Sequence, residues 1–308
     1  MTRPQRTQDP DATATGARTG AAFRFTAIGT GWQIYTERPL SQGVRAEVLA
    51  LTEDFDRVWS RFRRDSTVAR IAHAPGGGRF AFPARDAALL DLYDRLFAAT
   101  GGAVDPLVGR DLELLGYDAA YSLTADEAGL AGRVPDSWTR DVRREEAMVI
   151  TERPVVIDVG AAGKGFLVDL VVQALRDAGV DEFLVDGSGD LRHRGSQSVA
   201  VGLEHPTRAG RVIGTVPLYD GALCASATTR RIWGEGLHHV LDGRTGRPVH
   251  HVVATWAIAA DAATADGLAT ALFVADPADL ETFEFSWVRM LADGRVQWSN
   301  DFPGELFI

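Results

Sequence analysis

The sequence predicts a single α+β domain that combines a mixed β-sheet with packed helices. Segments with strand-like alternation and segments with helical spacing follow one another from residue 21 to residue 308. Hydrophobic residues make up 45% of the 308 residues and charged residues 24%, which is typical of a globular chain. Neither an internal repeat nor a low-complexity linker interrupts residues 21–308, so one domain is the simplest interpretation.

Residues 1–20 are predicted to form a disordered tail, because they contain no hydrophobic segment. They do not resemble a signal peptide, which favours a cytoplasmic location, or an extracytoplasmic one if an export signal has been removed. No apolar run approaches the roughly 20 residues that span a bilayer, so no transmembrane segment is expected. The net charge of −10 argues against nucleic acid as a partner but is compatible with a small anion held by a local cation. The single cysteine, Cys224, is expected to be a buried, inert thiol.

The first part of the domain is predicted to contain a strand followed by two helices. The strand is F-R-F-T-A-I-G-T, which alternates up to its glycine. Apolar residues from about Gln42 to Phe62 follow helical spacing, and a second helix carries Ala88 to Phe97 and ends at T-G-G, as a glycine C-cap would. Residues 120–146 are polar and weakly periodic, so we expect a surface excursion there.

A strand–helix–strand unit is predicted for the middle of the chain. P-V-V-I-D-V-G is interpreted as a strand that enters a glycine turn, and G-K-G-F-L-V-D-L-V-V-Q-A-L-R-D-A-G as an amphipathic helix with a glycine stop. F-L-V-D-G-S-G-D is interpreted as the second strand, again with a glycine turn at its end. We expect the two strands to be neighbours and their turns to meet at one edge of the sheet.

The C-terminal part is predicted to contain shorter strands, one buried helix and a closing hairpin. The strands are S-V-A-V-G-L, R-V-I-G-T-V-P-L and H-H-V-L-D. The helix covers D-A-A-T-A-D-G-L-A-T-A-L, from Asp261 to Leu272. The hairpin is expected in F-S-W-V-R-M-L-A-D-G-R-V-Q-W, with its turn at Asp293 and Gly294.

Asp266 and Thr270 lie four residues apart in the predicted helix, so their side chains would share one face of it. An oxygen-only pair of this kind suits a hard cation such as Mg²⁺, which takes one or two protein oxygens and fills its other positions with water or phosphate. The alternative is local hydrogen bonding, with Asp266 as a cap and Thr270 bonded back into its own helix. The spacing leaves both interpretations open.

Two further segments carry candidate chemistry. D-V-G-A-A-G-K-G-F departs from the Walker pattern, but it places Lys164 at a helix start, where the ammonium and the backbone N–H groups favour an anion. The alternative is a tight turn with a solvated lysine. H-H-V-L-D-G-R-T-G places His239 and Asp242 near a turn, where exposed polar residues of a hairpin are the alternative. A zinc site is not indicated, since the chain has neither a cysteine pair nor H-E-x-x-H.

Seven segments in order resemble the FAD:protein FMN transferases, the ApbE-type flavin transferases. The resemblance covers nearly the whole chain after the tail. The segments are A-I-G-T for A-M-G-T, W-S-R-F-R-R-D-S for F-S-x-Y-R-x-x-S, T-G-G-A-V-D-P-L-V-G for S-G-G-A-F-D-P-T-V-G, D-V-G-A-A-G-K-G-F for D-L-G-G-I-A-K-G-Y, D-G-S-G-D for the N/D-x-G-G-N/D turn, H-H-V-L-D-G-R-T-G for H-H-I-I-D-P-R-T-G, and A-D-G-L-A-T-A-L for A-D-A-L-A-T-A-L.

The resemblance implies roles for particular residues. Asp266, Thr270 and the backbone carbonyl of Ala161 match the metal-binding positions, and Asp266 and His239 match positions near the reacting phosphates. Lys164 matches the lysine near the FAD pyrophosphate. The positions that line the FAD pocket in the family correspond here to Ile28, Phe62, Ala103, Val104, Asp105, Asp158, Lys164 and Val240.

The resemblance implies an Mg²⁺-dependent enzyme that uses FAD as substrate. It would attach FMN through a phosphoester bond to a threonine or serine of a target flavoprotein and release AMP. Two alternatives stay open: an Mg²⁺-dependent FAD pyrophosphatase giving FMN and AMP, and a non-catalytic FAD-binding protein. The departures from the family pattern lie on the flavin side: Ile28 for Met, Phe62 for Tyr, Gly243 for Pro, and S-A-T-T-R-R at 226–231 for S-G-x-Y-x-R.

Overall fold

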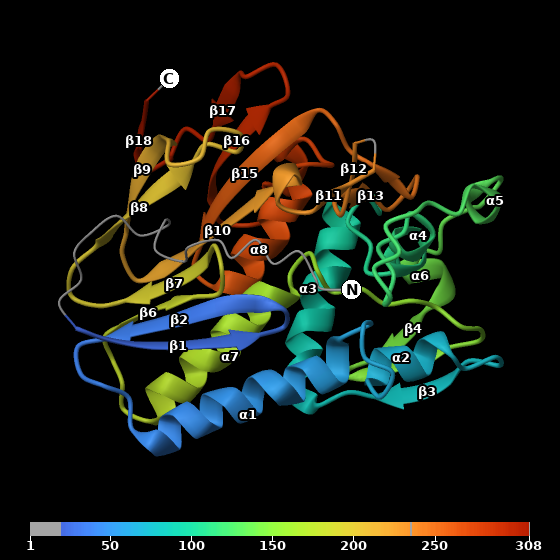
Figure 1. The fold of residues 1–308 in the computed structure, drawn as a ribbon, viewed down its shortest axis with the longest axis horizontal. Coiled ribbons are helices and arrows are strands. Elements are labelled where there is room, and N and C mark those ends of the chain that lie inside the picture. The colour runs from blue at the N-terminus through green and yellow to red at the C-terminus, as the bar shows by residue number, and fades with distance from the viewer. Residues whose placement is uncertain (1–19, 235, 308) are drawn as a thin grey trace.

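The computed structural model describes residues 20–234 and 236–307, so the predicted tail lies outside the described residues except for Gly20. A sheet of eight strands forms the centre of the fold (Figure 1). Its strands, in spatial order, are β1 (Ala21–Ala27), β2 (Thr30–Thr36), β6 (Phe183–Asp186), β7 (Asp190–Arg194), β10 (Gly221–Ala227), β15 (Val252–Ala259), β16 (Ser286–Leu291) and β17 (Val296–Trp298).

The α+β class is confirmed, with one refinement: the pairings within this sheet are antiparallel rather than mixed. Tight hairpins account for this, since β1–β2, β6–β7 and β16–β17 each join neighbours in the sequence. The predicted closing hairpin is therefore present, and Gly294 in its turn has φ = +87°. The predicted strand–helix–strand unit is wrong, because β6 pairs antiparallel with both β2 and β7.

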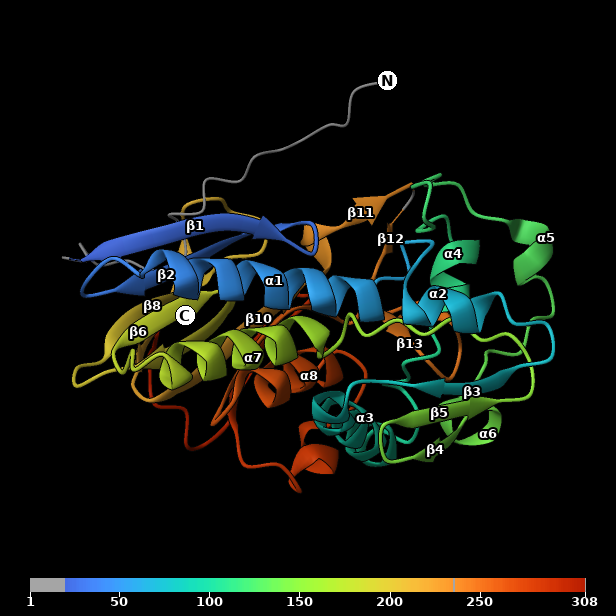
Figure 2. The ribbon, with the colours of Figure 1, turned by 90° about the horizontal axis from the view of Figure 1, so that it is seen from below.

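Three helices, α1 (Gln42–Trp59), α7 (Gly163–Asp177) and α8 (Ala262–Ala271), cover one face of the sheet (Figures 1 and 2). A fourth, α3 (Ala87–Ala99), packs against α8. The predicted helices are thus present, although the first ends at Trp59 instead of Phe62. Asp261 caps α8 by accepting a hydrogen bond from the backbone N–H of Thr264 at 2.8 Å. The larger apolar core lies between these helices and the sheet.

A second core fills the space between the opposite face of the sheet and three further strands. These strands pair antiparallel in the order β18 (Glu305–Leu306), β9 (Val212–Leu218) and β8 (Val199–Glu204). The predicted strands S-V-A-V-G-L and R-V-I-G-T-V-P-L correspond to β8 and β9. The buried side chains of this core include Leu191, Val201 and Trp256.

The remaining elements are short and gather mainly at one end of the molecule, to the right in Figure 1. They include residues 120–146, where the predicted surface excursion holds short elements and three buried side chains, Leu130, Asp136 and Trp138. The elements are β3 (Gly78–Ala81), β5 (Met148–Thr151) and β4 (Arg143–Glu145) in one sheet; α2 (Thr67–Ala72), α4 (Gly109–Leu114), α5 (Glu127–Leu130) and α6 (Trp138–Asp141); the pairs β11 (Ile232–Trp233) with β12 (Leu237–His238) and β13 (Leu241–Asp242) with β14 (Arg247–Pro248); and single 3-10 turns at Ala84–Asp86, Thr228–Arg230 and Pro277–Leu280.

Two predicted strands are not strands in the structure. Residues 154–160 (P-V-V-I-D-V-G) are irregular and have no partner strand among the described residues. Val155, Val156 and Ile157 are all buried, and the N–H of Asp158 bonds the carbonyl of Pro106 in another loop at 2.7 Å. The apolar run thus reflects burial from several sides rather than sheet pairing. H-H-V-L-D is divided between β12 and β13, with residues 239–240 between them.

Candidate functional site

Asp266 and Thr270 both reach from α8 across to the turn that begins α7. The carboxylate of Asp266 accepts a hydrogen bond at 2.9 Å from the backbone N–H of Gly165. The hydroxyl of Thr270 lies 3.3 Å from the backbone oxygen of Ala161, to which it donates. The alternative of purely local bonding within α8 is therefore wrong, because both side chains bond the turn that begins α7.

Gly165 allows this close approach of α7 and α8. A Cβ atom at Gly165 would lie 2.1 Å from the backbone oxygen of Ala262 and 2.7 Å from the Cβ of Asp266. A larger residue would therefore separate the two helices. The second glycine of the G-K-G sequence is explained by this backbone contact.

Asp190 joins Asp266 and Lys164 in a buried group of charges. Asp190 is fully buried and Asp266 is 6% exposed. The ammonium of Lys164 forms an ion pair with Asp190, so the interpretation of Lys164 as a solvated lysine is wrong. Burial raises the pKa of Asp266 well above its usual range, and the neighbouring Asp190 raises it further. Burial alone would lower the pKa of Lys164, but Asp190 and Asp266 more than offset this and raise it.

Asp190 is a residue of this group that the site prediction missed. It begins β7 at the end of the D-G-S-G-D turn, which the sequence had marked only as a glycine turn. Within the turn, Asp186 accepts a hydrogen bond from the N–H of Gly189 at 3.0 Å, and Ser188 adopts φ = +64°. The two glycine turns meet through Lys164 and Asp190, as predicted. The prediction that they end two neighbouring strands is wrong.

A cavity of about 80 Å³ lies beside Ala161 and Thr270. It brings together most of the residues singled out by the sequence, whereas Ile28, Phe62, Lys164 and Asp266 are not among its lining residues. Ile28 instead occupies the β1–β2 turn, with φ = +45°. The lining residues are Ala103, Val104, Asp105, Val108, Leu112, Tyr117, Asp158, Gly160, Ala161, Ser226, Arg231, His239, Val240, Leu241 and Thr270.

His239 offers a neutral imidazole to this cavity. Burial lowers its pKa to about 3, and the positive charge of Arg231 contributes to the shift. Its Nδ1 atom is buried and has no hydrogen-bond partner within the described residues. A neutral ring with an unpaired nitrogen can accept a proton from, or bond to, a group placed in the cavity.

The carboxylate of Asp158 is held by two neighbours. The Nε of Arg61 donates to its Oδ2 at 2.6 Å, and the N–H of Gly160 donates to its Oδ1 at 2.7 Å. Burial would raise the pKa of Asp158, but Arg61 outweighs it and the pKa is lowered. Asp158 thus lines the cavity as an ionised group and fixes the turn that presents the carbonyl of Ala161.

Phe62 lies beside a second and larger cavity of about 300 Å³, which Arg61 and Phe62 help to line. Its ring stacks on Tyr121 with centroids 5.3 Å apart and meets the ring of Tyr117 edge-on at 5.5 Å. Tyr117 also stacks on Trp233 at 5.4 Å. Phe62 of the larger cavity is thus in ring contact with Tyr117, which lines the smaller one.

Asp105 lines the smaller cavity, but its carboxylate is occupied by hydrogen bonds from backbone N–H groups. It accepts hydrogen bonds from the N–H groups of Leu107 at 2.8 Å and Trp138 at 3.0 Å. Burial raises its pKa to about 6, against the opposing effect of these bonds. Asp105 thereby ties α6 to the cavity wall.

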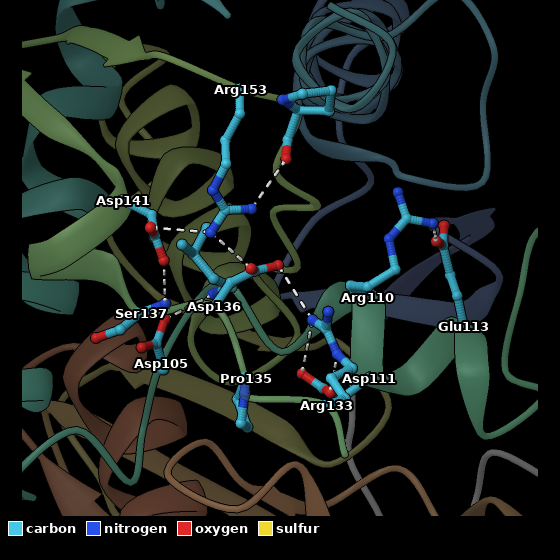
Figure 3. Close-up of polar contacts among 12 residues, drawn as sticks. Asp105, Arg110, Asp111, Glu113, Arg133, Pro135, Asp136, Ser137, Asp141 and Arg153 are labelled. Atoms are coloured by element: carbon cyan, nitrogen blue, oxygen red, sulfur yellow. Dashed lines mark hydrogen bonds and ion pairs between the residues drawn. The ribbon is translucent and has the colours of Figure 1, made fainter. Parts of the chain in front are cut away.

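An ion-pair network holds the same part of the chain (Figure 3). Arg133 contacts Asp111 at 2.7 Å and Asp136 at 3.1 Å. Arg153 contacts Asp136 at 2.8 Å and Asp141 at 2.9 Å. The network joins α4, α6 and the segment before residue 154, so the irregular excursion is fixed against the cavity wall.

The donor chemistry near Thr270 fits a hard divalent cation. Asp266, Thr270 and the Ala161 carbonyl offer only oxygen atoms, and Mg²⁺ prefers such ligands. Within residues 20–234 and 236–307, no group of three or more His, Cys, Asp and Glu side chains could hold a metal ion. The protein would therefore supply few ligands, and the remaining positions would go to water or to a ligand's phosphates.

Fold and site together define a class: an α+β protein with an antiparallel sheet, whose polar cavity combines candidate cation ligands with nearby arginine and histidine side chains. The ApbE family model matches residues 28–286, and the chain belongs to the ApbE family. The FAD:protein FMN transferase of Treponema pallidum is 30% identical over 278 residues, which cover 79% of this chain and 74% of that protein.

Solved structures share the fold. The ApbE protein from Thermotoga maritima has a TM-score of 0.81 and 26% identity, and the match covers 93% of this chain and 100% of that chain. The flavin transferase ApbE from Vibrio cholerae has a TM-score of 0.80 at 22% identity, covering 92% and 97%. None of the helices in the described part of the chain has the length and apolarity needed to cross a bilayer.

Proposed function

We propose that the protein is an Mg²⁺-dependent FAD:protein FMN transferase that attaches FMN to a threonine or serine of an acceptor flavoprotein and releases AMP. The observation that carries this proposal is that Asp266 and Thr270 both bond the turn of Gly165 and Ala161, beside a cavity that Ala161 and Thr270 line. Relatives named FAD:protein FMN transferase across most of the chain support it.

Asp266, Thr270 and the Ala161 carbonyl would hold the cation. When bound, Mg²⁺ would neutralise charge on the phosphates as the pyrophosphate bond breaks. Asp266 is buried, which keeps its carboxylate out of bulk water. An ionic contact is stronger in the protein interior than in water. The N–H of Gly165 orients this carboxylate, and Asp158 orients the turn that carries Ala161.

In the reaction, the acceptor hydroxyl oxygen forms a bond to the phosphorus of the FMN half of FAD. The bond between that phosphorus and the bridging oxygen breaks, and AMP leaves with the bridging oxygen. The hydroxyl proton must pass to a base, and the neutral ring of His239 can take it. Its pKa of about 3 makes it a weak base in the protein alone, but the negative phosphates of FAD would raise this pKa.

Arg231 and Lys164 provide positive charge near these groups. Arg231 lines the cavity with His239, and the helix start that carries Lys164 favours an anion. These charges suit the pyrophosphate of FAD. The second candidate function, hydrolysis of FAD to FMN and AMP, uses the same groups with water as acceptor. The segment S-A-T-T-R-R at 226–231, which replaces S-G-x-Y-x-R, keeps open the third alternative, a non-catalytic FAD-binding protein.

The test incubates the purified protein with FAD and Mg²⁺, with and without an acceptor domain that carries a flavinylation-site threonine. Transfer predicts a covalently fluorescent acceptor in a denaturing gel and AMP in proportion to it, both abolished by EDTA. AMP formed equally without acceptor would support the hydrolase instead. Tight FAD binding without either product would refute both enzyme functions.

Asp266→Ala provides the second arm of this test. We expect loss of metal-dependent turnover and weaker Mg²⁺ binding by calorimetry, because the variant removes the only carboxylate proposed as a ligand. Asp186→Asn, in the β6–β7 turn, is the matched control, since asparagine can still accept the hydrogen bond from Gly189. If Asp266→Ala retained full activity, the assignment of the cation site would be wrong.

A further inference from the structure

Arg61 carries unused hydrogen-bond donors in the interior of the protein. Its side chain is 4% exposed, and its Nε donates to Asp158 at 2.6 Å. Its Nη1 and Nη2 atoms are buried and have no hydrogen-bond partner among the described residues. Such buried unpaired donors are rare in native proteins and cost about 1–3 kcal/mol each. An acceptor supplied by a ligand would remove this cost.

Arg61 is part of the partition between the two cavities, which we define as Arg61, Phe62 and Tyr117. The guanidinium carbon lies 4.2 Å from the ring centroid of Phe62 and 5.1 Å from that of Tyr117. Arg61 and Phe62 line the larger cavity, whereas Tyr117 and Asp158 line the smaller one. A ligand that spans both cavities would therefore pass directly beside the guanidinium.

The smaller cavity is too small for a dinucleotide, so the partition must open. Its volume is about 80 Å³, whereas drug-sized ligands occupy sites of roughly 300–1,000 Å³. Tyr117 belongs to residues 116–124, a loop that closes with a hydrogen bond from the N–H of Leu123 to the carbonyl of Gly116 at 2.8 Å. Tyr121 and Leu123 adopt φ values of +52° and +53° and are about half exposed. Each such residue costs about 1–2 kcal/mol, and a movement of the loop would release this strain.

We propose that Arg61 is a specificity-determining residue for the flavin ring of FAD. When loop 116–124 moves aside, the ring lies against Phe62 and its carbonyl oxygens accept hydrogen bonds from Nη1 and Nη2 of Arg61. The isoalloxazine ring combines a flat face with carbonyl acceptors on one edge, which suits an aromatic side chain beside a planar guanidinium. The adenine ring lacks carbonyl groups and offers only ring nitrogens as acceptors. This inference rests on the proposed function, because it takes FAD as the substrate.

Arg61 occupies the position that the related motif F-S-x-Y-R-x-x-S leaves open, so the contact would be a property of this chain rather than of the motif. The same chain has Phe62 in place of the motif's tyrosine, which removes a hydroxyl from the flavin side. Donors from Arg61 would supply polar contacts where that hydroxyl is missing. Arg61 and Phe62 are adjacent in the sequence and lie at the same partition.

The test compares binding of FAD and of ADP, which lacks the flavin ring, by isothermal titration calorimetry with EDTA present to prevent turnover. For Arg61→Met we expect the Kd for FAD to rise at least about tenfold, because charge-assisted hydrogen bonds are lost. The Kd for ADP should stay within about twofold, because ADP makes no ring contact. Arg70→Met is the matched control: Arg70 is exposed on α2 and lines neither cavity, and we expect both Kd values to be unchanged.

Arg61→Met leaves the buried Asp158 carboxylate without its cation. The double variant Arg61→Met/Asp158→Asn is therefore measured as well, since it buries no unpaired charge. We expect the same selective loss of FAD affinity in the double variant. Equal weakening of FAD and ADP would show a merely structural role and overturn the proposal, as would an unchanged Kd for FAD. Failure of the unaltered protein to bind FAD when Mg²⁺ replaces EDTA would refute the proposed function itself, which distinguishes the two failures.

Discussion

Gly165 lies where the backbones of α7 and α8 come into contact, and its replacement by alanine gives a direct test of how the site is built. The added Cβ would lie 2.1 Å from the backbone oxygen of Ala262. Carbon and carbonyl oxygen ordinarily approach no closer than roughly 3.3 Å, so the two helices would have to separate by about 1 Å. Backbone on both sides leaves no flexible side chain to yield. The same movement would lengthen the 2.9 Å bond from Gly165 to Asp266.

The expected loss of unfolding free energy for Gly165→Ala follows from three contributions. Overpacking costs about 1–3 kcal/mol. Loss of the hydrogen bond to the Asp266 carboxylate costs about 1.5–3 kcal/mol. The better helix propensity of alanine returns at most about 1 kcal/mol. We therefore expect a net destabilisation of about 3 kcal/mol.

Urea unfolding followed by circular dichroism measures this loss, with Gly267→Ala as the matched control. Gly267 is a helical glycine of α8, but the nearest atom to its added Cβ is Cδ1 of Leu96, at 2.7 Å, which is the flexible end of a side chain. Side-chain adjustment and improved propensity should keep this variant within about 1 kcal/mol of the unaltered protein. Equal stability of the two variants, or a loss below about 1 kcal/mol for Gly165→Ala, would refute the reasoning.

Two further changes test the charges around α7 and α8. Burial raises the pKa of Asp169, which caps α8 by accepting from the N–H groups of Ala262 and Ala263, to about 7 from an ordinary value of 3.8. Because the folded value is the higher one, its stabilising contribution is complete below about pH 4 and is lost as the pH rises through about 7. Asp169→Asn should flatten the unfolding free energy between pH 5 and 8, and an unchanged profile would contradict the shift. Lys164→Met should cost about 3 kcal/mol or more, since it leaves buried Asp190 unpaired. Adding Asp190→Asn should recover most of this loss in urea unfolding; a double variant less stable than Lys164→Met would exclude the explanation.

The parts of the site that depend on local spacing could be predicted from the sequence. Asp266 and Thr270 share a face because a helix places residues four apart on one side, and the apolar residues around them predict that helix. The glycine stops after α3 and α7 could also be predicted, because glycine is the residue that most readily ends a helix. Gly101 and Gly179 adopt positive φ values of +58° and +74°. Each of these features is determined within a few residues of chain.

Features that depend on distant partners could not be predicted in this way. The run at 154–160 is apolar because several elements bury it, and an isolated apolar run does not reveal whether a strand lies beside it. The predicted neighbour of β6 was wrong for the same reason, because its partner β2 lies about 150 residues earlier in the chain and no local pattern indicates it. The ion pair of Lys164 with Asp190 likewise joins two turns that are separate in the sequence.

The buried polar atoms around the cavities argue that this region is built for a ligand rather than for stability. Arg61 and His239 contain buried nitrogen atoms without hydrogen-bond partners in the described part of the chain, and Asp190 is fully buried beside a second carboxylate, Asp266. Stability alone would favour apolar replacements or complete pairing at such positions. Arg61 is bonded to Asp158, which lines the cavity with His239, while Lys164 links Asp190 to the same α7 turn. The unused donors and repelling carboxylates thus lie among the groups proposed to bind FAD and its cation, which supports that proposal.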